Sequence, residues 1–77
     1  MEEPPNRPVT VAFGQFLREH RMARNLTQKE AAALVGKSPA WYGRVERGQG
    51  KVDFELAVIL CEGMGENFIK FVMAYKP

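Results

Sequence analysis

Apolar residues recur at roughly helical spacing in the first part of the chain. Between residues 11 and 24 they form one candidate buried face, consisting of Phe13, Phe16, Leu17 and Met22. Thr10 can cap the first turn, and Asn25 suits the left-handed conformation that commonly ends a helix. The pattern therefore predicts a first helix over residues 11–24. The segment before it contains three prolines, so residues 1–9 are expected to form a flexible N-terminal arm.

Two further helices are predicted with a very short connection between them. A Thr-x-x-Glu capping box over residues 27–30 predicts a helix over residues 28–35. Shortly afterwards, Ser38 is a candidate N-cap and Pro39 stands at the first helical position, where proline is favoured, which predicts a helix over residues 39–47. Two helices joined by so short a turn form the helix-turn-helix pattern.

The residue types within this pair fit that geometry. Ala32 is small because the following helix must pack across it, and Gly36 permits a sharp change of direction. Tyr42 and Val45 are expected on the inward face of the second helix of the pair. The outward face then carries apolar and guanidinium groups suited to thymine methyls, guanine edges and phosphates in a DNA major groove: Ala40, Trp41, Arg44 and Arg47.

The remainder of the chain predicts two more helices and no strand. Asp53 can cap a fourth helix, which Gly63 and Gly65 end, with an apolar content of Phe54, Leu56, Val58, Ile59 and Leu60. In residues 67–75, apolar side chains stand at positions i, i+3, i+4 and i+7: Phe68, Phe71, Val72 and Tyr75. The expected fold class is all-α, with five short helices in a single domain over residues 10–77.

Length and composition limit the functions open to the chain. Its 77 residues, 45% of them hydrophobic, are typical of one small globular domain and not of a multidomain enzyme. A single cysteine, Cys61, and a single histidine, His20, supply neither an internal disulfide nor a zinc site, so no metal or cofactor is expected. No apolar run approaches the roughly 18 residues of a membrane span. The protein is therefore expected in the cytoplasm.

Positive charge is concentrated in the middle of the chain. The net charge of the whole chain is only +2. Residues 18–51, however, contain eight Lys and Arg against three Glu, so this stretch alone carries +5. The asymmetry favours a polyanionic partner for the helix-turn-helix region.

Two runs of residues carry a resemblance to a known family. They are Leu26-Thr27-Gln28-Lys29-Glu30-Ala31-Ala32 and Val35-Gly36-Lys37-Ser38-Pro39-Ala40-Trp41-Tyr42-Gly43-Arg44-Val45-Glu46-Arg47-Gly48. They resemble the Xre/Cro/C1 class of helix-turn-helix regulators, which includes phage repressors, and the resemblance extends from about Phe13 to Gly65. It implies a compact lambda-repressor-like fold and sequence-specific binding of double-stranded DNA. It also implies a small transcriptional regulator, expected to be a repressor.

The resemblance also implies roles for individual residues. Members commonly pair an Arg late in the first helix with the Glu that ends the third helix, here Arg21 and Glu46. The start of the second helix, here Thr27 and Gln28, is expected at a DNA phosphate. Base contacts are expected from the third helix, from Pro39, Ala40, Trp41 and Arg44. Flanking cations are expected to contact further phosphates: Lys37, Arg47 and Lys51.

Two positions of the third helix leave alternatives open. Arg44 either contacts a guanine edge, the favoured interpretation, or acts as a phosphate clamp or solvated charge. Trp41 either contacts a thymine methyl, donates its indole N–H to a phosphate, or covers a neighbouring helix.

The last helix also allows two interpretations. Its apolar residues either complete the monomer core or, as favoured, form a dimer interface within residues 66–76 from Phe68, Phe71, Val72 and Tyr75. A homodimer would bind a pseudo-palindromic operator with half-sites roughly 34 Å apart. The alternative function is an antitoxin or other interaction module whose main partner is a protein. An enzyme is not expected, because no nucleophile with a base is recognisable and residues 48–51 have the wrong spacing for a phosphate-binding loop.

Overall fold

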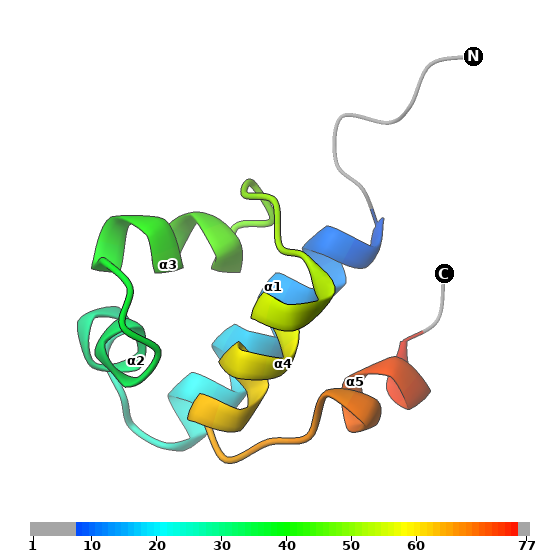
Figure 1. Cartoon of the computed structure of the whole chain (residues 1–77). Coiled ribbons are helices and arrows are strands. Elements are labelled where there is room, and N and C mark those ends of the chain that lie inside the picture. The colour runs from blue at the N-terminus through cyan, green and yellow to red at the C-terminus, as the bar shows by residue number, and fades with distance from the viewer. Residues whose placement is uncertain (1–7, 76–77) are drawn as a thin grey trace.

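Five helices make up the computed structural model, which describes residues 8–75 (Figure 1). They are α1 (Pro8–Ala23), α2 (Gln28–Leu34), α3 (Pro39–Glu46), α4 (Phe54–Gly63) and α5 (Phe68–Ala74). No strand occurs among the described residues, so the predicted all-α fold class is confirmed. Among these residues, no helix has the length and apolar character needed to span a membrane.

The beginning of α1 differs from the prediction. The helix begins at Pro8, not at residue 11, so Thr10 lies inside it and is not its cap. Proline is well suited to the first helical turn because the missing N–H has no partner there in any case. Positions 8 and 9 of the expected flexible arm are therefore helical, and the rest of that arm lies outside the described residues. The predicted end is present, because Asn25 adopts a φ of 57° two residues after the last residue of the helix.

Helices α2, α3 and α4 begin where their caps were predicted. Thr27 and Glu30 form the reciprocal capping box of α2. Ser38 Oγ accepts a hydrogen bond of 3.1 Å from the backbone of Trp41 at the start of α3. Asp53 caps α4 in the same way. Each of these bonds joins residues three apart, so the caps could be predicted from the sequence alone.

The core is formed by one cluster of buried side chains to which every helix contributes. In Figure 1, α2 and α3 lie on one side of the molecule and α5 on the other, with α1 and α4 between them. The cluster consists of Phe13, Leu17, Ala31, Ala32, Tyr42, Val45, Ala57, Leu60, Cys61, Met64 and Phe71. The predicted inward orientation of Tyr42 and Val45 is confirmed, since their exposed fractions are 1% and 2%.

The C-terminal helix packs against both α1 and α4. The ring of Phe71 lies 5.2 Å from the rings of both Phe13 and Phe16, and its residue is only 5% exposed. Phe71 therefore belongs to the monomer core, and the prediction that it lies on a dimer interface is wrong. Of the other three residues predicted for that interface, Phe68 and Tyr75 are half-buried and Val72 is exposed. Most of the apolar stripe of α5 therefore packs against the core of the same chain.

Candidate nucleic-acid interface

The turn between α2 and α3 is short and sharply bent. Gly36 adopts a φ of 69°, a left-handed conformation that favours glycine, and the backbone N–H of Lys37 donates back to the carbonyl of Ala32. Ala32 itself is fully buried. The small side chain of Ala32 and the left-handed turn at Gly36 thus place α3 directly across α2, as predicted from the sequence.

The outward face of α3 is open to solvent. Of the predicted base-contacting residues, Pro39, Ala40 and Arg44 are exposed. Trp41 is half-buried and packs against the core, and the Lys37 ammonium lies 5.1 Å from the centre of its ring. Trp41 therefore covers part of the protein interior. Its ring is partly accessible and lies beside Lys37. A contact between Trp41 and DNA stays a prediction.

A buried ion pair holds α3 against α1. Arg21 donates from Nε and from one terminal nitrogen to the two carboxylate oxygens of Glu46, at 2.6 and 3.1 Å. Its other terminal nitrogen donates to the carbonyl of Leu26 at 2.9 Å. The side chain of Glu46 is 3% exposed and that of Arg21 is 13% exposed. The structure thus brings together the two residues that the family resemblance paired, in a bidentate geometry that fixes both orientation and distance.

The surroundings of Glu46 favour its ionised form. Burial by itself opposes ionisation, but the hydrogen bonds from Arg21 and Gln28 outweigh it, so the pKa of Glu46 is lowered. The same pair raises the pKa of Arg21. Tyr42 lies beside the pair with a buried hydroxyl, and burial raises the pKa of that phenol. The pair therefore remains charged at neutral pH.

The predicted phosphate-contacting residues differ in how free their side chains are. Lys37, Arg47 and Lys51 are exposed, and Arg47 also donates to the side chain of Gln49 at 3.1 Å. Gln28 uses its side-chain amide to donate to Glu46 at 3.0 Å, which joins α2 to the ion pair. Thr27 is engaged in the capping box. Gln28 is thus first of all a link between helices, which the sequence analysis did not predict.

A cleft next to this network adds a residue that the sequence analysis missed. Its volume is about 210 Å³, and its lining consists of Arg18, Arg21, Gln28, Glu46 and Arg47. Arg18 lies one helical turn before Arg21, so the spacing of the two arginines was the available signal. The cleft brings exposed guanidinium groups of α1 and α3 to the start of α2, an arrangement suited to a phosphate.

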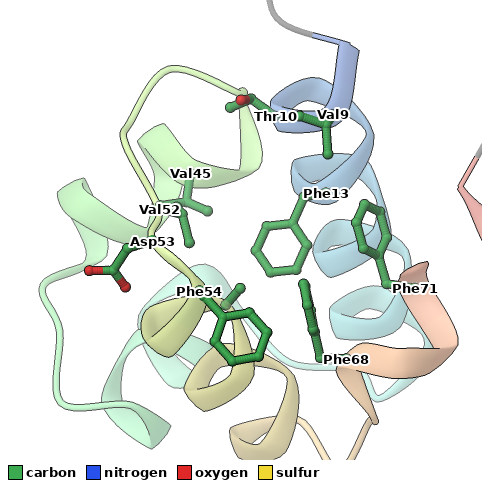
Figure 2. A pocket seen from close by; sticks show the side chains of 10 residues that line it. Val9, Thr10, Phe13, Val45, Val52, Asp53, Phe54, Phe68 and Phe71 are labelled. Carbon is green, nitrogen blue, oxygen red and sulfur yellow. The ribbon is translucent and has the colours of Figure 1, made fainter. Parts of the chain in front are cut away.

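A larger cavity lies away from the outward face of α3. It measures about 270 Å³ and is lined mainly by apolar side chains of α1, α4 and α5 together with Val45 and Val52. Figure 2 shows the rings of Phe13, Phe54 and Phe68 gathered around it, whereas the Asp53 carboxylate points away. Phe54 is 72% exposed beside it. This region combines apolar surface with few polar groups and does not resemble the α3 surface.

Cys61 and His20 both make packing contacts within the fold. Cys61 is fully buried, and burial raises the pKa of its thiol to about 11. His20 packs on the ring of Phe16, with 4.4 Å between ring centres, and its Nδ1 lies 3.0 Å from the carboxylate of Glu66. Both contacts are consistent with packing roles.

The geometry of α2, the turn and α3 agrees with comparison to known proteins. Residues 12–66 match the protein-family model described as "Helix-turn-helix domain". The chain belongs to this family. The match confirms both the predicted motif and the resemblance to the Xre/Cro/C1 class. No significant match was found among curated protein sequences.

Solved structures of regulators resemble this helix-turn-helix protein over most of its length. One crystal structure of the clp gene regulator ClgR from Corynebacterium glutamicum has a TM-score of 0.82 and 27% identity, covering 92% of this chain and 91% of that one. Another ClgR structure gives 0.80 and 28%, covering 90% and 73%. The restriction-modification controller protein C.AhdI from Aeromonas hydrophila gives 0.75 and 35%, covering 80% and 94%. The similarity thus includes the whole five-helix arrangement.

Proposed function

We propose that this helix-turn-helix protein regulates transcription by binding double-stranded DNA with α3 in the major groove. One observation carries the proposal: the Arg21–Glu46 pair holds the inner side of α3 against α1. The outer side of α3 remains exposed at Pro39, Ala40 and Arg44. Membership of the family and the regulators among its structural neighbours support it. Its site of action is the cytoplasm, with the DNA.

Base reading and phosphate binding are assigned to different side chains. Arg44 projects from the exposed side of α3 and suits the O6 and N7 acceptors of guanine, the commonest specific contact. Lys37, Arg47 and Lys51 flank it and contact phosphates, as does the start of α2 at Thr27 and Gln28. Arg18 joins this set through the cleft that it shares with Arg47. Trp41 and Lys37 act together at the edge of the interface.

A homodimer is the form proposed to bind DNA. Large apolar side chains of α4 and α5 remain exposed in the single chain: Phe54, Ile69, Val72 and Met73. Phe54 and Ile69 line one surface hollow, and an exposed apolar patch of this kind marks an interaction site. Two-fold pairing through it would present two copies of α3 to half-sites about one DNA turn, roughly 34 Å, apart. Occupation of such an operator would repress transcription.

The decisive experiment is selection of bound sequences from a random DNA library. A palindromic consensus with fixed half-site spacing is expected, together with a dimer in sedimentation on the selected DNA. Enrichment of one unpaired half-site would contradict the dimer and leave the DNA-binding function standing. The absence of any enriched sequence would contradict the proposed function itself.

The exposed apolar surface also favours a second candidate, an interaction module of the same fold whose main partner is another protein. Phe54 and Met73 are 72% and 79% exposed, so their apolar side chains are available to a protein partner. The selection experiment distinguishes the transcriptional regulator from the protein-interaction module. A protein-binding module would show only salt-sensitive, sequence-independent binding to DNA, whereas a regulator selects an operator.

A further inference from the structure

The junction between α4 and α5 is centred on one carboxylate. The side chain of Glu66 is 11% exposed, and two cationic side chains and a histidine surround it. Arg24 approaches its Oε2 at 2.7 Å and His20 approaches the same oxygen at 3.0 Å. Lys70 lies 3.5 Å from Oε1. His20 lies in α1, Arg24 directly follows α1, and Lys70 lies in α5, so the carboxylate joins two helices that are far apart in sequence.

The backbone at the same residue forms the bend itself. Gly65 adopts a φ of 73°, and the N–H of Glu66 donates to the carbonyl of Cys61 at 2.8 Å, which closes the end of α4. The next residue, Asn67, caps α5 by accepting from the N–H of Ile69 at 2.8 Å. Residue 66 thus lies in the connection between α4 and α5, and its side chain ties this connection to the end of α1.

Residues at and just after the end of α1 bind both α3 and the bend between α4 and α5. Arg21 holds α3 through Glu46, and His20 and Arg24, on adjacent turns, hold the α4–α5 bend through Glu66. The apolar contacts of α5 fix its distance from α1, because Phe71 packs on Phe13 and Phe16. Ring contacts of this kind tolerate tilting, whereas hydrogen bonds from several directions restrict an angle. The angle of α5 relative to α3 is therefore defined through α1.

We propose that Glu66 is a positioning residue that sets the direction of α5, and thereby the spacing of the two DNA half-sites that a dimer recognises. The proposal rests on the dimeric DNA binding proposed above. The ion pairs are near the surface, where such pairs contribute little to stability. Their loss should consequently change the geometry of the dimer more than the stability of the subunit.

The test compares Glu66→Gln with the wild-type protein and with Glu62→Gln, an exposed carboxylate of α4 one turn before the bend. Binding is measured to a set of operators that share the selected half-site and differ only in spacing. We expect the wild type and Glu62→Gln to prefer one spacing by about tenfold, which corresponds to 1.4 kcal/mol. For Glu66→Gln this preference should fall to threefold or less. Affinity for an isolated half-site should not change.

A charge exchange separates positioning from a general loss of packing. Arg24→Glu alone should lose the spacing preference, and Arg24→Glu combined with Glu66→Arg should recover it. If Glu66→Gln fails to fold, the charge-exchange pair decides the question by itself. Unchanged spacing preference in Glu66→Gln, or no recovery in the double variant, would overturn the role of Glu66. A wild-type protein without any spacing preference would instead overturn the proposed dimer.

Discussion

At the scale of single residues, the side chains at and near α3 are of two kinds: some are hydrogen-bonded within the protein and others are exposed. Glu46 and Gln28 are occupied within the protein, whereas Arg44 is exposed on the outward side. A residue that already satisfies its hydrogen bonds internally contributes by holding α3 in place. An exposed residue without such internal hydrogen bonds, such as Arg44, is available to contact DNA.

Arg44→Ala should therefore reduce both the affinity and the sequence preference of DNA binding. Loss of a bidentate contact to guanine is expected to cost about 1 to 3 kcal/mol and to relax selection at one base pair of each half-site. The measurement is a titration of the selected operator and of variants at each position. Retained affinity and retained preference would show that Arg44 does not read a base.

Lys51→Ala is the matched control for that variant, since Lys51 is exposed and assigned to a phosphate. It should weaken binding to all sequences alike and reduce the slope of log affinity against log salt by about one unit. A loss confined to the selected operator would contradict this assignment.

At the scale of helices, the close approach of α1 and α3 depends on Gly14. A Cβ atom added there would lie 2.5 Å from the backbone carbonyl oxygens of both Val45 and Glu46. No side-chain rotation relieves contacts with backbone atoms. The absence of a side chain at this position therefore determines how near α3 can come to α1, and with it the geometry of the Arg21–Glu46 pair.

Gly14→Ala should accordingly destabilise the domain, although alanine is the better helix former by about 1 kcal/mol. Forced separation of the two helices is expected to reduce the free energy of unfolding by about 2 kcal/mol or more. Urea denaturation gives this value directly. Gln15→Ala, at the neighbouring exposed position of α1, should change stability by less than about 0.5 kcal/mol. Equal stability of the Gly14→Ala and wild-type proteins would contradict the close approach.

At the scale of the whole molecule, two lowered carboxylate pKa values couple folding to pH. The Arg24 hydrogen bond lowers the pKa of Glu66, and for Glu46 the hydrogen bonds from Arg21 and Gln28 outweigh burial. Both groups bind a proton more weakly in the folded than in the unfolded chain. Their stabilisation is therefore complete above the ordinary glutamate pKa of 4.5 and is lost as the pH falls below it.

Glu46→Gln should reveal the larger of these two contributions. Removal of a charged, buried hydrogen-bonding group is expected to lower the free energy of unfolding at pH 7 by about 2 kcal/mol. The difference from the wild type should shrink as the pH decreases below about 4.5, because the unfolded wild-type chain then binds a proton at Glu46 before the folded chain does. Urea denaturation at a series of pH values measures both effects. A difference that stays constant down to pH 3 would contradict the lowered pKa.

Pairing of two molecules is a further property of the whole, and Ile69 provides its test because it is 60% exposed on α5. Ile69→Glu should shift sedimentation from dimer to monomer and weaken operator binding by tenfold or more, while leaving the unfolding midpoint nearly unchanged. Gln15→Glu, an added charge on the exposed side of α1, is the control. A dimer that survives Ile69→Glu would exclude this surface as the interface.

The sequence by itself determined the elements and the motif. Capping residues such as Thr27, Ser38 and Asp53 act on N–H groups two or three residues away, so their effect is readable without knowledge of the fold. The short Gly-containing turn and the small Ala32 likewise specify how α3 crosses α2. These local features sufficed to predict five helices and to assign the family resemblance.

Only the tertiary structure decided which surfaces are used within the chain. An amphipathic stripe reveals that a face is covered but not by what, so Phe71 was assigned to an interface and lies in the core. The partner of Gln28 is 18 positions away, and Arg24, which directly follows α1, is 42 positions away from Glu66. Pairs at such separations arise from the packing of whole helices. The arrangement that positions α3 and α5 through α1 was therefore beyond the reach of sequence pattern.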